Sequence, residues 1–264
     1  MKLIFFLFFV LLSIQSTCFA RNIETSSVKS LSLGNTLPKN THAELPTSVF
    51  FQDCMSLNIN QTGQYLHSEL QSTNIEAGWR KGRFRGAGLL HTFGYRHYRM
   101  FGAAISSATK IHPDALIGVS LHYQQLKYTG MDSSPVTLST SLAFSYDLSN
   151  RYLLYSNLHI PLINNSAHFN VYDEATLGCL FRFSQTSEWT IETSLKNKRN
   201  VVVKTSYEYT VNAFSLRFGV FGTPIVPTFG FGYQWQSISM NLSDQWHLAL
   251  GHTLSIGLSY ELKK

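Results

Sequence analysis

The sequence predicts an all-β fold: a closed antiparallel transmembrane β-barrel of about 14 strands, with 12 as the alternative. Three observations lead to it. Apolar residues alternate with small or polar ones over long stretches, no apolar run after residue 20 is long enough for a transmembrane helix, and the chain begins with an export signal. Successive side chains of a β-strand point to opposite faces, and a strand that crosses a bilayer needs about 9–11 residues. Apart from helices, only closed barrels satisfy their backbone hydrogen bonds in lipid.

The first twenty residues have the pattern of a secretory signal peptide. Met1-Lys2 is a short basic start, Leu3–Leu12 is an unbroken apolar run, and Cys18-Phe19-Ala20 has small residues at both positions that a signal peptidase reads. The apolar run is too short to span a bilayer. Lipoprotein processing at Cys18 is disfavoured because Gln15, three positions earlier, is not aliphatic. We expect cleavage after Ala20 and export from the cytoplasm.

The composition agrees with an outer wall that faces lipid. Charged residues make up 14% of the chain and aromatic residues another 14%, whereas about a quarter of the residues in ordinary soluble domains are charged. Aromatic residues form girdles at both rims of transmembrane barrels. The net charge of +6 is modest, and its lysines and arginines are scattered. We expect no nucleic-acid partner, and a soluble secreted β-protein is a less favoured alternative.

Residues 21–48 are expected to lie between the signal peptide and the barrel. They are polar, rich in Ser, Thr and Asn, and show no sustained periodicity. This segment either hangs in the periplasm or enters the barrel as a plug. The barrel itself is expected over residues 49–264, with its first strand near Val49–Ile59.

The stretch Ala115–Tyr146 is the clearest hairpin of the predicted barrel. In its first arm Ile117, Val119 and Leu121 share one face, and Ser120 lies on the other. Further alternating runs are expected near residues 73–79, 87–95, 101–105, 152–160, 175–183, 189–195, 201–209, 214–220, 229–235 and 254–262. Because bacterial single-chain barrels have even strand numbers, about 13 visible runs predict about 14 strands.

One region departs from the simple alternation. The apolar parity switches at Ile238, Met240 and Leu242, which indicates a β-bulge. Residues 243–251 are expected to be a connection that leads to the closing strand.

The polar parity of these strands supplies the candidate lumen-facing residues. They are Ser120, His122, Gln124, His159, Glu192, Lys204, Glu208, Arg217 and Gln234. Charges that point into a narrow barrel must be paired, so the four charged members are interpreted as mutually neutralising. The two histidines are interpreted as hydrogen-bonded interior residues, with solute contact or gating as the alternative.

No catalytic, cofactor or metal site is expected. None of the ten histidines is followed two residues later by serine, the arrangement of outer-membrane lipid hydrolases, and the acidic residues are dispersed. No histidine pair has metal-ligand spacing on a common face. Cys54 and Cys179 could pair in an oxidising periplasm, but Cys179 alternates with apolar residues, which favours two unpaired thiols.

Three short stretches resemble the FadL-type superfamily of outer-membrane barrels, and within it the PorV/PorQ-like branch with components of the type IX secretion system. They are Ser32-Leu33-Gly34-Asn35, the run from Phe101 to Tyr123, and Leu250-Gly251-His252-Thr253 leading into the last strand. The terminal Lys263-Lys264 departs from the aromatic end usual in such barrels.

The resemblance implies an outer-membrane protein that passes or binds a hydrophobic or small solute. The alternative that it implies is a structural, secretion-associated barrel that acts through protein partners. The expected partners are therefore outer-membrane lipid together with a hydrophobic small-molecule solute or, for the alternative, secretion-system proteins.

Overall fold

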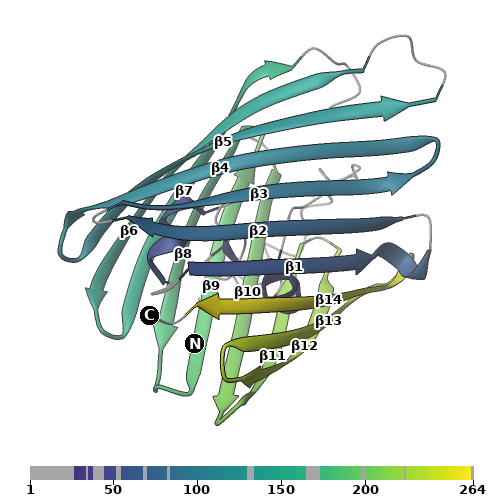
Figure 1. Ribbon diagram of the computed structural model, residues 1–264. Helices are drawn as coiled ribbons and strands as arrows, with labels where there is room; N and C mark the ends of the chain where they lie inside the picture. The colour runs from purple at the N-terminus through teal and green to yellow at the C-terminus, as the bar shows by residue number, and fades with distance from the viewer. Residues whose placement is uncertain are drawn as a thin grey trace.

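The computed structural model describes residues 27–33, 35–37, 45–51, 55–67, 70–81, 84–129, 134–164, 173–197, 200–222 and 224–262. Their dominant feature is a closed barrel of 14 antiparallel strands (Figure 1). The strands are β1 (Met55–Gly63), β2 (Gln71–Lys81), β3 (Phe84–Tyr95), β4 (Tyr98–His112), β5 (Ala115–Tyr128), β6 (Val136–Ser149), β7 (Tyr152–Asn164), β8 (Glu174–Arg182), β9 (Ser187–Lys196), β10 (Asn200–Val211), β11 (Phe214–Phe221), β12 (Val226–Trp235), β13 (Ile238–His247) and β14 (Gly251–Leu262). Each pairs with its neighbours in sequence, and β1 closes the barrel by pairing with β14. The predicted fold class and strand number are confirmed.

Short helices accompany the strands. They are α2 (Val28–Ser32), η2 (Pro46–Phe51) and η3 (Gln64–Leu66), the last in the connection between β1 and β2. The Ser27 hydroxyl caps α2 by accepting a hydrogen bond from the Ser30 amide at 3.1 Å, as serine at an N-cap commonly does. Within the described ranges, no helix has the length and apolar character needed to cross a membrane.

The two ends of the barrel differ in the length of their connections. Met55 pairs with Leu262, so the chain enters and leaves the barrel at one end, the terminal end. Connections at this end have two residues, except for four between β8 and β9. At the opposite loop end, three connections are longer, namely residues 64–70, 129–135 and 165–173. Transmembrane barrels have this asymmetry, with short turns in the periplasm and longer loops outside.

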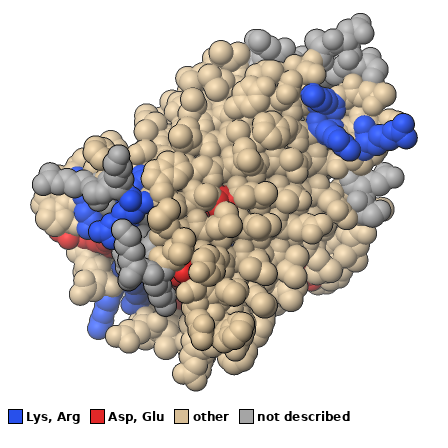
Figure 2. All heavy atoms as spheres, in the orientation of Figure 1, with Lys and Arg blue, Asp and Glu red and all other residues tan. Residues whose placement is uncertain are grey.

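The outer face of the barrel is apolar and the inner face is small and polar. On β5, Val119 is 47% exposed and Ser120 only 1%, and Leu142 lies opposite Val119 on β6 with a similar exposure. Figure 2 shows the outer face as a broad, almost uncharged band between two ends that carry the charged side chains. This arrangement matches a wall that contacts lipid.

Aromatic side chains mark the rims of the apolar band. At the terminal end, Tyr152 and Phe181 are cross-strand neighbours with ring centroids 5.5 Å apart. Trp189 is the next neighbour of Phe181, and the centroids of these two rings are 5.6 Å apart. At the loop end, Trp246 stacks on His252. The same imidazole lies 2.8 Å from the outward-facing carboxylate of Asp244. Such girdles are expected where the wall meets the lipid headgroups.

Two strand predictions were wrong in detail. The first strand begins at Met55 and not near Val49, because Pro46–Phe51 forms the 3-10 helix η2. The run expected to continue through a bulge is two strands: β12 ends at Trp235, and β13 runs from Ile238 to His247, so residues 243–247 are strand and not a connection. The turn between them has Gln236 in the left-handed region, at φ 51°.

The prediction that Cys54 and Cys179 are both unpaired is tested only for Cys179. Cys179 lies on β8, half-buried, and forms no disulfide with a described residue. Cys54 lies outside the described residues, as does the signal peptide with its expected cleavage after Ala20.

Candidate functional site in the barrel lumen

The described part of the N-terminal segment lies against the inner wall of the barrel. Helix α2 contacts β11 to β14 and β1, and η2 contacts β3 to β6, so the two short helices rest on different parts of the wall, inside the barrel of Figure 1. Inward-facing glycines make room for them. A Cβ added at Gly230 would lie 2.0 Å from the Ser32 Cβ, and one at Gly118 would lie 2.7 Å from the Pro46 Cβ. Side chains at these two positions would displace the segment.

Wall side chains satisfy the backbone of this segment. The Thr228 hydroxyl donates to the Ser32 carbonyl at 3.0 Å, and the Gln245 amide donates to the Leu31 carbonyl at 3.3 Å. Both acceptors lie in the last turn of α2, where helical carbonyls lack intrahelical partners. Thr47 of η2 is joined to Ser145 through their hydroxyls at 2.6 Å. The segment is therefore bonded to the barrel and not merely enclosed by it.

Glu192 on β9 anchors the middle of the segment. Its side chain is fully buried. One carboxylate oxygen accepts from the Leu37 amide at 2.8 Å and from the Tyr155 hydroxyl at 3.0 Å. The other lies 2.7 Å from the Lys204 ammonium, which also donates to the Asn35 carbonyl at 2.9 Å. A buried ion pair of this kind needs further hydrogen bonds to compensate for its desolvation, and residues 35–37 supply two of them.

A second group of charges lies toward the terminal end. Glu188 on β9 and Glu208 on β10 are directly opposite in register, and two carboxylates so placed repel each other. Separate cations neutralise them. The Arg217 guanidinium donates to Glu208 at 2.9 Å and the Lys29 ammonium lies 3.4 Å from it, while Arg182 lies 3.8 Å from Glu188. The predicted interior charges are thus paired, and Lys29 of α2 takes part.

The two predicted histidines belong to a hydrogen-bonded cluster. His122 Nε2 lies 2.7 Å from the Ser120 hydroxyl and 3.2 Å from that of Ser141, and Ser141 in turn lies 2.9 Å from His159 Nδ1. The imidazole centroids are 5.3 Å apart. The wall therefore carries a continuous row of donors and acceptors across β5, β6 and β7.

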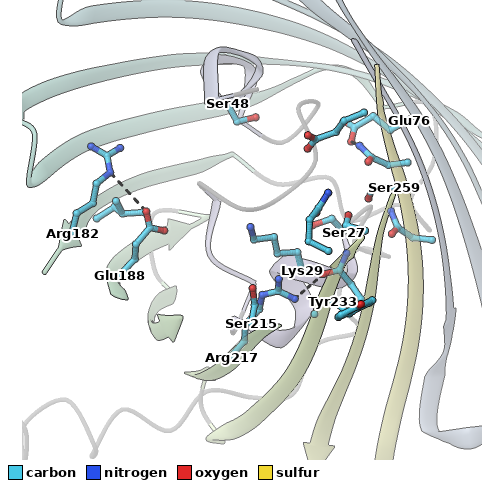
Figure 3. Close-up of a pocket in the computed structure, with 18 of the residues that line it drawn as sticks. Ser27, Lys29, Ser48, Glu76, Arg182, Glu188, Ser215, Arg217, Tyr233 and Ser259 are labelled. Atoms are coloured by element: carbon cyan, nitrogen blue, oxygen red, sulfur yellow. Dashed lines mark hydrogen bonds and ion pairs between the residues drawn. The ribbon is translucent and has the colours of Figure 1, made fainter. Parts of the chain in front are cut away.

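A cavity of about 460 Å³ lies between the N-terminal segment and the terminal end. Its lining includes residues beside the turns of that end, such as Ser215, Gln234 and Ser239, and Lys29 from α2. Figure 3 shows Arg182 and Glu188 facing each other on one side, with Lys29 and Arg217 on another. A lining of this kind, with amides, hydroxyls and paired charges, offers hydrogen bonds without a large net charge.

A small apolar cluster lies on the inner wall near the loop end. Phe93, Met100 and Leu126 are consecutive cross-strand neighbours on β3, β4 and β5, and all three are buried. Leu70 and Tyr98 pack against them. The inner wall thus carries an apolar patch on three neighbouring strands near the loop end.

The structure places the nine sequence-predicted residues on the inner face but not at one site. Ser120, His122 and His159 form the histidine cluster, and Gln124 lies nearer the loop end. Glu192 and Lys204 anchor the N-terminal segment, whereas Arg217 and Gln234 line the cavity and Glu208 pairs with Arg217.

Sequence reasoning missed several cavity residues. Asn58, Asn60 and Glu76 line the cavity from β1 and β2, and their parity, opposite to Leu57, Ile59 and Ile75, could have indicated them. Lys29 could not be found in this way because the N-terminal segment has no period.

The fold and lumen together define a 14-stranded β-barrel with a lipid-compatible exterior and an N-terminal segment inside. No protein-family model matches the sequence, and no curated protein sequence matches it. Solved structures do resemble it in fold.

Three of these structures cover nearly the whole described barrel. The Pseudomonas putida toluene transporter TodX aligns with a TM-score of 0.68 at 11% identity, over 90% of this chain and 98% of that chain. The CymD monoaromatic hydrocarbon channel aligns with a TM-score of 0.68 at 11% sequence identity, over 90% of this chain and 98% of that chain. A Pseudomonas aeruginosa FadL homologue aligns with a TM-score of 0.63 at 10% sequence identity, again over 90% of this chain and 98% of that chain. Identities this low show a shared fold, which agrees with the FadL-type resemblance of the sequence.

Proposed function

We propose that this chain is an outer-membrane β-barrel through which a small hydrophobic solute passes. The observation that carries the proposal is the closed barrel with an apolar outer face, whose lumen holds an N-terminal segment and still leaves a cavity of about 460 Å³. Pockets that bind small molecules commonly have volumes of roughly 300–1,000 Å³. A barrel that served only as a scaffold would have no need of such a cavity.

The direction of passage follows from the ends of the barrel. Short connections at the terminal end favour a periplasmic location for it, so the loop end faces outward. A solute from outside then meets the inward-facing Phe93, Met100 and Leu126 before it reaches the polar cavity. The named solutes of the similar barrels, toluene and monoaromatic hydrocarbons, also support a hydrophobic solute.

Uptake of radiolabelled toluene by cells that carry the full chain tests this proposal. The outer membrane of such cells is the barrier, and cells with an empty vector provide the baseline. We expect faster initial uptake with the chain present. Met100→Ser should slow this uptake several-fold, whereas Met240→Ser, the same change on the outer face of β13, should not. Uptake equal to that of the empty vector would contradict the proposal, and swelling of proteoliposomes in arabinose without toluene uptake would assign a polar solute instead.

The chain is further proposed not to be an enzyme. Ser120 precedes His122 by two residues, and the two side chains are hydrogen-bonded at 2.7 Å. Ser120 is 1% exposed and faces the packed lumen, so a bulky lipid ester would not reach it. We expect the purified unchanged chain and Ser120→Ala to show equal background rates of lipid hydrolysis, and faster hydrolysis by the unchanged chain would contradict the proposal.

The secretion-associated alternative and its protein partners rest on the sequence resemblance to the PorV/PorQ-like branch. No observation in the described part of the chain favours them over solute passage. Removal of the signal peptide after Ala20 belongs to the outer-membrane proposal, and N-terminal sequencing of protein from the membrane fraction tests it.

A further inference from the structure

Three basic side chains form a cluster on the outer rim of the loop end. Arg96 lies in the turn between β3 and β4, and Arg99 and Lys127 lie opposite each other in register on β4 and β5. All three are exposed. Figure 2 shows a group of Lys and Arg at the right-hand end, where β3, β4 and β5 meet in Figure 1, with no acidic side chain beside it in this view. We name this set the rim cluster.

Arg99 and Lys127 point outward. Their neighbours Met100 and Leu126 are buried on the inner face, and successive side chains on a strand alternate between faces. Like charges directly opposite each other on a sheet are destabilising. In the part of the chain that the structure describes, no carboxylate forms an ion pair with any member of the rim cluster. The arrangement therefore calls for an anion from outside the described residues.

The strand next to Arg99 carries no side chain at the matching position. Gly94 of β3 lies opposite Arg99 on the other side from Lys127, so the row across the three strands is glycine, arginine and lysine. Gly94 has φ 101°, a conformation that residues with a Cβ rarely adopt, and a Cβ there would lie 2.1 Å from the Tyr98 carbonyl oxygen. The position therefore suits glycine, and β3 supplies no carboxylate beside the guanidinium at this row.

The rim cluster lies just beyond the apolar band. From the outward-facing Phe101 to Ile111, β4 rises about 33 Å along its axis at roughly 3.3 Å a residue. With the usual tilt of about 40° this spans about 25 Å across the membrane, which is the height of the lipid-facing band of such barrels. Arg99 is two residues beyond Phe101 toward the loops. Its guanidinium is therefore at the level of the lipid headgroups.

We propose that the rim cluster binds the phosphate groups of lipid A in the outer leaflet of the outer membrane. The inference rests on the proposed function only for the orientation of the barrel, with the loop end outward. Arginine suits this partner because its planar guanidinium holds phosphate oxygens in pairs. Lys127 adds a second donor at the neighbouring position, so one phosphate can contact both side chains.

Native mass spectrometry of the full chain, purified in detergent and incubated with purified lipid A, tests the proposal. The test variant is Arg99→Gln/Lys127→Gln. The matched control is Lys110→Gln/Arg151→Gln, which removes two exposed basic side chains at the terminal end. Because both side chains donate charge-assisted hydrogen bonds to phosphate, their loss should lower lipid A retention by at least about tenfold. The control should retain lipid A as the unchanged chain does.

Two comparison lipids make the outcome decisive. Dephosphorylated lipid A should bind the unchanged chain as weakly as lipid A binds the test variant. Equal retention by the test and control variants would overturn the proposal, as would equal retention of lipid A and phosphatidylglycerol, which would point to a general anionic surface. Toluene uptake by cells carrying the unchanged chain separates the two proposals, because retention of lipid A by this chain without toluene uptake leaves the rim cluster in place and removes the proposed function.

Discussion

At the residue scale, Glu192 combines three contacts on one buried carboxylate. It pairs with Lys204, and it accepts hydrogen bonds from Tyr155 of the wall and Leu37 of the N-terminal segment. The sequence placed Glu192 and Lys204 on the inner parity of neighbouring strands and predicted that they are paired. It could not predict the bond to Leu37, because the fold of residues 35–37 is set by contacts with the wall and not by a local pattern.

Glu192→Gln tests this account of the anchor. The change leaves Lys204 as an uncompensated buried charge, and breaking a buried pair in this way costs about 3–5 kcal/mol. We expect that loss in the free energy of unfolding, measured by urea titration of the folded barrel in detergent. The double variant Glu192→Gln/Lys204→Met should recover part of it, because neither charge remains. A double variant less stable than Glu192→Gln would contradict the pairing.

At the element scale, alternation predicted the faces of the strands better than their ends. The hairpin Ala115–Tyr146 and the inward glycines opposite aromatic residues on β12 follow directly from period two. The turn at Gln236-Ser237 was missed because Gln236 adopts a left-handed conformation that glycine or asparagine usually takes. The start of β1 was misplaced because Val49–Phe51 consists of residue types that favour strands, although it belongs to the 3-10 helix η2.

The contact between α2 and β12 gives a second prediction. In Gly230→Ala the new Cβ would lie 2.0 Å from the Ser32 Cβ, so α2 must move away from the wall. Because the barrel backbone at this position accepts an L residue, the barrel itself should still form. We expect a higher single-channel conductance in planar bilayers. Gly102→Ala is the control, because its new Cβ would make only ordinary van der Waals contacts at 3.5 Å and beyond. Equal conductance in the two variants would mean that α2 does not obstruct the lumen.

At the scale of the whole molecule, the outer and inner faces of the barrel have opposite polarity, and this determines the environment that the barrel fits. The outer face is apolar between two rims with aromatic and charged residues, and the inner face is polar and packed around the N-terminal segment. The composition and the period of two were enough to predict this inversion, because a strand in lipid must put its apolar parity outward. The solute was not predictable from the strands, because the cavity depends on how the N-terminal segment divides the lumen.

The inversion predicts opposite responses to one substitution. Val119→Arg places a charge in the apolar band, where arginine costs about 2–4 kcal/mol near the midplane. Ser259→Arg places the same side chain beside the cavity, where water and Glu261 are available. Folding of the two variants into lipid vesicles, followed by the intensity of the folded band on a gel, should show a loss only for Val119→Arg. Equal losses would be inconsistent with the assignment of the faces.

The most direct test of the central claim, a lipid-embedded closed barrel, is the migration of the unheated and heated protein on a denaturing gel after separation of the membranes. A closed barrel resists detergent until it is heated, because every strand is hydrogen-bonded on both sides. We predict that the protein is found in the outer-membrane fraction and that heating shifts its band to a different apparent mass. A protein recovered in the soluble periplasmic fraction, with one band before and after heating, would contradict the account.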